Sequence, residues 1–164
     1  MPNLGIATSG GGYRAALFGA GILNALDGRN STSAGIGTGG LLQTATYLSG
    51  LSGGSWLITS LVQANFPLIQ DLIFGSSYDG ALTGWLTQFG FITPTNDSTQ
   101  NQKFVVELVS EIKGKLHAGF PVTITDVWAR TLARHFMNGT TAANFVDNSS
   151  AHGAGVTFSG LADL

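Results

Sequence analysis

A serine set among small residues is the first feature of this chain that could do chemistry. Ser52 lies in Gly50-Leu51-Ser52-Gly53-Gly54, between a short strand expected over 46–51 and a helix expected over 55–62. Glycines allow the sharp strand-to-helix turn that exposes a serine hydroxyl, and the helix N-terminus favours developing negative charge. Ser55 is the competing nucleophile, but it would lie inside the helix. The spacing therefore favours Ser52 as a nucleophile for acyl transfer.

A second glycine cluster lies forty residues upstream, in Ser9-Gly10-Gly11-Gly12-Tyr13-Arg14. It follows an apolar run over 4–8 that predicts a buried strand, and it precedes an apolar helix expected over 13–26. Three consecutive glycines can turn their N–H groups toward one point and so bind an oxyanion or a phosphate. Arg14 opposes the dipole in the first turn of that helix, which indicates a purpose other than helix stability.

Together these two motifs resemble the fungal phospholipase B (lysophospholipase) family, a relative of cytosolic phospholipase A and, more distantly, of patatin. The resemblance rests on Ser-Gly-Gly-Gly-Tyr-Arg-Ala and Gly-Leu-Ser-Gly-Gly-Ser-Trp, with weaker support over 40–48, 118–120 and 125–130. It implies that Ser52 is the nucleophile, that the N–H groups of Gly11 and Gly12 form the oxyanion hole, and that Arg14 steadies the substrate phosphate. It also implies a phospholipid or lysophospholipid substrate at a lipid surface and no cofactor.

The chain departs from that family in its base. These enzymes use a Ser-Asp dyad whose aspartate lies far downstream in an Asp-Gly-Gly motif, and no such motif occurs here. Asp79 precedes Gly80 and Ala81 and is too near Ser52 in sequence to fit the family order. Both ends of the chain look cut. We therefore expect an incomplete catalytic domain that lacks its base and is inactive, or nearly so, by itself.

The expected fold is α/β, a three-layer and mostly parallel sheet of the patatin and cytosolic phospholipase type, incomplete in this chain. Within the partial domain 1–164, residues 4–62 hold the glycine loop and the turn at Ser52. Residues 63–102 form a possible cap or loop-rich insertion, although core packing is the first interpretation of their aromatic residues. Residues 103–164 continue as helices, with an amphipathic helix over 103–117 and another after Thr125. Glu111–Lys115 and Asp126–Arg130 are the expected i, i+4 ion pairs.

Composition excludes several classes of protein. The net charge is −2 and the basic residues are scattered, so a nucleic-acid interface is not expected. Only 10% of the 164 residues are charged and the mean hydropathy is +0.24, which indicates surfaces meant to be covered. No apolar run reaches membrane-spanning length. There is no cysteine, and His117, His135 and His152 lack metal-ligand spacing, so no metal is expected.

Four glycosylation sequons favour a secreted or cell-surface parent protein. They begin at Asn30, Asn96, Asn138 and Asn148.

Two alternatives to a Ser-Asp hydrolase remain open. His152 could complete a Ser-His-Asp triad in an ordinary α/β-hydrolase, where the base comes last in the chain. The first glycine cluster could instead be a nucleotide-binding loop, since Gly10, Gly12 and Ala15 fit a weak form of the dinucleotide pattern. No acidic residue ends a plausible second strand, however, and residues 35–40 lack the Lys-Ser/Thr of a P-loop. That glycine-rich stretch is expected to be a flexible connection.

Overall fold

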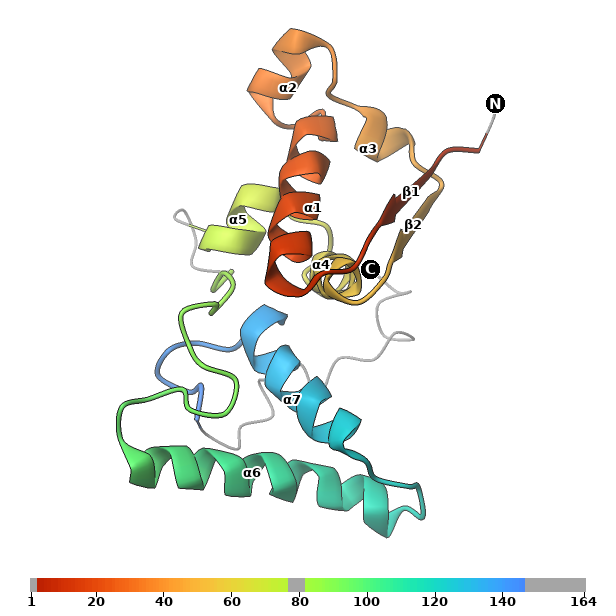
Figure 1. Ribbon diagram of the computed structural model, residues 1–164. Helices are drawn as coiled ribbons and strands as arrows, with labels where there is room; N and C mark the ends of the chain where they lie inside the picture. Colours follow the sequence, from red (N-terminus) through yellow and green to blue (C-terminus); the bar gives the residue numbers. More distant parts are fainter. Residues whose placement is uncertain (1–2, 77–81, 147–164) are drawn as a thin grey trace. The chain divides into compact units, whose positions relative to one another are not determined.

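The chain is a mixed α/β protein that folds as two compact units, residues 1–82 and 83–164 (Figure 1). A computed structural model describes residues 3–76 and 82–146. The described part of the first unit contains a parallel pair of strands with helices packed beside it, and that of the second contains a pair of helices. The two units are therefore treated separately below.

The sheet of the first unit pairs two strands that lie far apart in sequence. Strand β1 (Gly5–Thr8) and strand β2 (Tyr47–Gly50) are parallel, with Thr8 opposite Gly50 at their carboxyl ends. A parallel pair needs a crossover connection, and the helices between residues 12 and 44 provide it. The register brings the segment after β1 and the segment after β2 to the same edge of the sheet (Figure 1).

Two helices begin directly at that edge. Helix α1 (Gly12–Leu26) follows β1, helix α4 (Gly53–Gln63) follows β2, and the two pack against each other. A Cβ atom on Gly19 would lie 2.9 Å from Leu57 Cδ2, so the absent side chain lets the helices approach closely. The buried residues of this contact are small or aliphatic: Ala16, Ala20, Leu23, Leu57 and Leu61. The expected bounds of the strands and helices in residues 4–62 are confirmed to within about two residues, but β1 is not the buried strand that was expected, since its four residues are exposed or half-buried.

The glycine-rich connection between α1 and β2 is more ordered than expected. It contains two short helices, α2 (Ser31–Ile36) and α3 (Leu41–Thr44). Gly37 ends α2 in the left-handed region with φ 81°, and the Thr38 hydroxyl donates to the carbonyl of Ala25 at 2.7 Å. Short helices of this kind depend on tertiary hydrogen bonds rather than on apolar periodicity, which is why the sequence did not reveal them.

Helix α4 ends at Gln63, and a turn at Asn65 and Phe66 follows it. Asn65 and Phe66 both have positive φ, and helix α5 (Ile69–Phe74) follows. Ile69 and Leu72 of α5 are buried, and so are Trp85 and Leu86 of the second unit. Core packing is therefore the correct interpretation of these four side chains.

In the second unit, helices α6 (Ser98–His117) and α7 (Ile124–Phe136) pack against each other. Helix α6 begins five residues earlier than predicted, because the Asp97 side chain accepts hydrogen bonds from the N–H groups of Thr99 and Gln100. Helix α7 begins before Thr125, because Thr123 and Asp126 form a capping box. A hydrophobic cluster is built from Leu86, Phe104, Leu108 and Phe145.

Both expected i, i+4 ion pairs are wrong, because partners on the facing helix compete for the same charges. Glu111 accepts two hydrogen bonds from Arg134, at 2.5 and 3.1 Å, and lies 3.9 Å from Arg130. Lys115 pairs instead with Asp126, at 2.5 Å. The charges of α6 and α7 therefore join the two helices to each other.

Candidate functional site

The candidate site is built around a strained turn at Ser52. This residue lies between β2 and α4 with φ 51° and ψ −120°, a region that residues with a side chain rarely adopt. Strain of this kind persists only where the surrounding structure holds it, and it concentrates at functional sites. Ser52 is exposed, and its hydroxyl makes no hydrogen bond to any described residue. The arrangement is the strand-turn-helix geometry typical of a serine nucleophile.

Three glycines make the turn sterically possible. A Cβ atom on Gly50 would lie 2.5 Å from the Gly54 carbonyl oxygen. One on Gly53 would overlap the carbonyl oxygen of Gly12, and one on Gly54 would lie 2.5 Å from that of Thr8. At each of these three positions the backbone of another residue lies too close for a side chain, so only glycine fits.

The upstream glycine loop lies directly against the turn, as the parallel register requires. A Cβ atom on Gly10 would be 2.9 Å from Ser52 Cβ and 3.6 Å from Ser52 Oγ. Gly11 is the N-cap of α1 with φ 137°, and Gly12 opens the helix with φ 64°. The N–H groups at the start of a helix have no acceptor within it, so they are available to an anion. The structure therefore places the loop that holds Gly11 and Gly12 beside the turn, with Gly10 against Ser52 and Gly12 against Gly53.

An aromatic pair fixes the start of α1 against α4. The rings of Tyr13 and Trp56 meet edge to face with centroids 5.9 Å apart, and Trp56 also lies 4.0 Å from the Cβ position of Gly12. Burial raises the pKa of Tyr13 to about 12, so its phenol stays neutral across the physiological range. Tyr13 therefore contributes packing to the glycine loop and no charge.

Arg14 is exposed in the first turn of α1, one residue beyond that pair. It makes no ion pair with any described residue, and the first turn contains no acidic residue. A cation at the positive end of a helix dipole is electrostatically unfavourable unless an anion binds nearby. The position is suited to a negatively charged ligand group.

Within residues 3–76, no acidic or histidine side chain forms a hydrogen bond with Ser52. Asp27 lies at the far end of α1 and is bound by Arg29 and Gln43. In the second unit, both ring nitrogens of His135 face carbonyl oxygens, of Thr131 at 2.8 Å and of Phe89 at 3.1 Å. Burial lowers the pKa of His135, although those two bonds partly offset it. The two other candidates weighed from the sequence, Asp79 and His152, lie outside the described residues.

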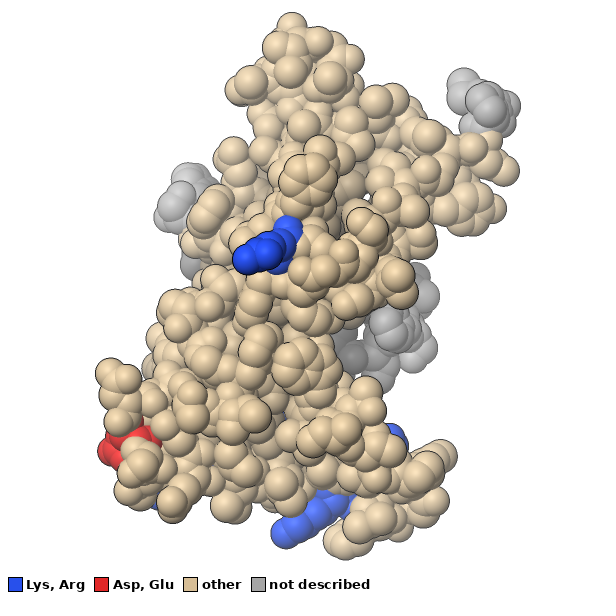
Figure 2. Space-filling model, in the orientation of Figure 1, with Lys and Arg blue, Asp and Glu red and all other residues tan. Residues whose placement is uncertain are grey.

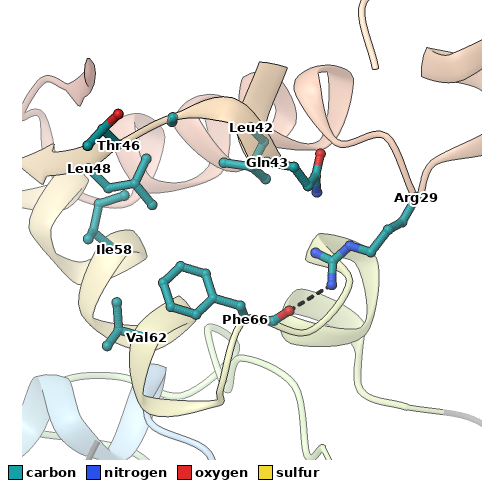
Figure 3. A pocket seen from close by; sticks show the side chains of 9 residues that line it. Arg29, Leu42, Gln43, Thr46, Leu48, Ile58, Val62 and Phe66 are labelled. Carbon is teal, nitrogen blue, oxygen red and sulfur yellow. Dashed lines mark hydrogen bonds between the residues drawn. The ribbon is translucent and has the colours of Figure 1, made fainter. Parts of the chain in front are cut away.

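A cavity of about 530 Å³ lies beside α4 and away from the turn (Figure 3). Neither Ser52 nor the glycine loop lines it. Its wall is mainly apolar, with Leu48, Ile58 and Val62 on one side, while Arg29 donates to the Phe66 carbonyl at 2.8 Å at the other end. The Arg29 guanidinium is thus engaged by protein groups, and the cavity is not an anion site.

Charged side chains are sparse on the face of the molecule shown in Figure 2. Over residues 3–76 and 82–146, no three histidine or acidic side chains gather closely enough to hold a metal ion. Within the same residues, no helix combines the length and the apolar character needed to cross a membrane.

Several residues of this site were not identified from the sequence. Gly10 packs against Ser52. The Thr8 carbonyl accepts a hydrogen bond from Leu51 N–H at 3.0 Å, and the Ser55 hydroxyl donates one to the Gly50 carbonyl at 2.7 Å. All of these residues except Thr8 lie within the two motifs, and the contacts that Gly10 and Thr8 make with the turn follow from the register of β1 and β2. Parallel pairing of the two strands before the glycine motifs is the signal that could have indicated it.

The described part of the first unit is thus a parallel α/β unit with an exposed serine at the turn between strand and helix. Residues 4–159 match the family model described as the lysophospholipase catalytic domain, and the chain belongs to this family. The family resemblance inferred from the two glycine motifs is thereby confirmed.

Three curated relatives show how much of a longer protein the chain spans. It is 45% identical over 148 residues to lysophospholipase 1 of Aspergillus fumigatus, covering 85% of this chain and 22% of that protein. It is 40% identical over 167 residues to lysophospholipase 2 of the same fungus, covering 99% of this chain and 26% of that protein. It is 36% identical over 168 residues to lysophospholipase 2 of Saccharomyces cerevisiae, and this alignment covers 100% of this chain and 22% of that protein. No solved structure matches the chain significantly.

Proposed function

We propose that this chain supplies the nucleophile and the oxyanion hole of a lysophospholipase, a carboxylic ester hydrolase that acts on (lyso)phospholipids. One observation supports it most: the glycine loop after β1 lies against an exposed serine held in a strained turn after β2. The family match and the lysophospholipase relatives support the substrate class. We further propose that the complete domain has a three-layer α/β fold with a mostly parallel sheet, to which β1 and β2 contribute.

In the proposed reaction, Ser52 Oγ attacks the ester carbonyl carbon while a base takes the hydroxyl proton. The negative charge that develops on the carbonyl oxygen is bound by the N–H groups of Gly11 and Gly12. The tetrahedral intermediate collapses with loss of the glycerol alkoxide, which receives a proton, and leaves a fatty-acyl ester on Ser52. Water, activated by the same base, then releases the fatty acid and restores the serine.

Two further roles complete the proposal. Arg14 binds the phosphate of the headgroup, for which its exposed and unpaired position at the N-terminus of α1 provides support. The base is the aspartate of a Ser-Asp dyad, in an Asp-Gly-Gly motif that residues 1–164 do not contain. Since the described acidic residue nearest in sequence to the glycine loop, Asp27, is bound by Arg29, it is unsuited to that role. We expect residues 1–164 alone to have little or no activity.

The test follows fatty acid release from lysophosphatidylcholine by the longest natural chain that contains these residues. Ser52→Ala should lower kcat by at least ~10³-fold, because the acyl-enzyme can no longer form. Ser49→Ala is the matched control, since Ser49 is exposed three residues earlier and its side chain forms no hydrogen bond with any described residue. Full activity in Ser52→Ala would contradict the proposal.

A further inference from the structure

The turn at Ser52 needs contacts that hold it, because its backbone conformation is disfavoured. Three backbone hydrogen bonds contribute. Leu51 N–H donates to the Thr8 carbonyl at 3.0 Å, and Gly54 N–H donates to the Leu51 carbonyl at 2.9 Å. Trp56 N–H donates to the carbonyl of Ser52 itself at 3.1 Å. None of these bonds joins the last residue of β2 to the first turn of α4.

That connection is made by the side chain of Ser55. Its hydroxyl donates to the Gly50 carbonyl at 2.7 Å, a bond that bridges Ser52 from the end of the strand to the helix. A serine within a helix ordinarily bonds a carbonyl three or four residues earlier in the same helix. Here the acceptor is five residues earlier and belongs to β2, so the bond fixes the angle between strand and helix rather than the helix alone.

Gly50 and Ser55 depend on each other sterically. A Cβ atom on Gly50 would lie 2.7 Å from Ser55 N and 2.5 Å from the Gly54 carbonyl oxygen. The glycine therefore allows the strand end to rest on the Gly54–Ser55 peptide, and the serine hydroxyl then binds the carbonyl brought there. This arrangement also commits the Ser55 proton, which makes Ser55 unsuited to be the nucleophile.

We propose that Ser55 is a positioning residue that holds Ser52 in the conformation needed for attack. The inference rests on the proposed function, in which Ser52 is the nucleophile. Without the bond, Ser52 Oγ would sample positions away from the oxyanion donors Gly11 and Gly12. Rates of acyl transfer are sensitive to such misplacement, whereas binding of the phospholipid in the ground state is not.

The test compares Ser55→Thr with Ser55→Val in the longest natural chain, using lysophosphatidylcholine. The two replacements have nearly the same size, and only threonine carries a hydroxyl. We expect Ser55→Val, like Ser55→Ala, to have a kcat roughly tenfold to a hundredfold below that of Ser55→Thr, with KM unchanged within about twofold. The rate at which a fluorophosphonate labels Ser52 should follow kcat. Equal melting temperatures for the threonine and valine variants would show that the loss is not one of folding.

Two results would overturn the inference, and they are distinguishable. If Ser52→Ala is inactive but the threonine and valine variants have equal kcat and labelling rates, the positioning role fails while the proposed function stands. If Ser52→Ala keeps full activity, the proposed function fails and the role of Ser55 falls with it.

Discussion

Asp27 is fully buried at the end of α1, and four hydrogen bonds from two side chains reach its carboxylate, together with one from the backbone N–H of Arg29. Arg29 Nε lies 3.0 Å from Oδ1, Arg29 Nη2 lies 2.8 Å from Oδ2, and Gln43 Nε2 lies 2.7 Å from Oδ1. Burial by itself would raise the pKa of Asp27, but the bonds from Arg29 and Gln43 outweigh it and hold the pKa below its usual value. The charged form is therefore the stable one in the folded chain.

We expect this carboxylate to make the stability of the first unit depend on pH. Because the pKa of Asp27 is lower in the folded than in the unfolded chain, its contribution is complete above the unfolded value of about 3.9. It is lost as the pH falls through the folded pKa. Urea unfolding at pH 7 and at a series of values down to about 3 should show a steeper loss in the wild type than in Asp27→Asn. Identical slopes would contradict this assignment.

Arg29→Gln provides the complementary prediction. Arg29 also donates to the carbonyls of Phe66 and Pro67, at 2.8 and 3.0 Å, so it ties the turn after α4 to the end of α1. Its removal leaves a buried carboxylate without its cation, which should cost on the order of 3 kcal/mol of unfolding free energy at pH 7. A loss below about 1 kcal/mol, the range of an exposed pair, would show that Asp27 is solvated.

The glycosylation sequons differ in what their asparagines do. Asn30 caps α2 and donates to the Asn24 carbonyl at 3.3 Å, and Asn138 accepts from Thr83 N–H at 3.2 Å while Thr140 of its sequon is buried. Asn96 is exposed in the loop before α6, and Asn148 lies outside the described residues. If the protein is secreted, glycopeptide mass spectrometry should find Asn96 occupied and Asn30 and Asn138 largely bare. High occupancy at Asn30 would contradict this.

At the scale of elements, the sequence indicated what local patterns determine and missed what tertiary contacts determine. The apolar runs and glycines around β1, α1, β2 and α4 placed those elements correctly. Helices α2 and α3 were not predicted, because they are held by hydrogen bonds between residues far apart in sequence, such as the bond from Gln43 to Asp27. Glu111 and Lys115 were expected to pair with each other within α6. Sequence spacing does not show that α7 faces α6, and the two residues pair with Arg134 and Asp126 of α7 instead. The turn at Ser52 was predictable, whereas the bond from the Ser55 hydroxyl to the Gly50 carbonyl depends on the angle between β2 and α4, which the sequence pattern does not show.

The contact between the glycine loop and the turn at Ser52 gives a prediction for two glycines that both lie in helices. A Cβ on Gly53 would overlap the Gly12 carbonyl, so Gly53→Ala should separate the loop from Ser52 and lower kcat by at least about a hundredfold. A Cβ on Gly21, within α1, meets nothing within 4 Å, so Gly21→Ala should preserve kcat and stabilise the chain by up to about 1 kcal/mol. Equal activities in the two variants would show that close apposition is not needed.

At the scale of the whole molecule, the two units hold themselves together differently. The first packs small and aliphatic residues between α1 and α4, with Asp27 and Arg29 at one end. The second has a fully buried arginine, Arg134, which binds both oxygens of Glu111, donates to the Phe145 carbonyl at 3.0 Å and lies over the Phe104 ring. A buried guanidinium is tolerated only while its charge and donors are satisfied.

Glu111→Gln therefore tests whether the units are energetically separate. Removing the carboxylate charge leaves Arg134 buried without a counterion, at a cost of about 3–5 kcal/mol in the unit that contains it. Hydrogen exchange should show lost protection over α6 and α7 and little change over α1 and α4, since local stability follows contiguous cooperative units. Lys115→Gln is the control, because its pair with Asp126 lies at the surface and should matter far less. A uniform loss across both units would contradict this and mean that the chain unfolds as one cooperative body.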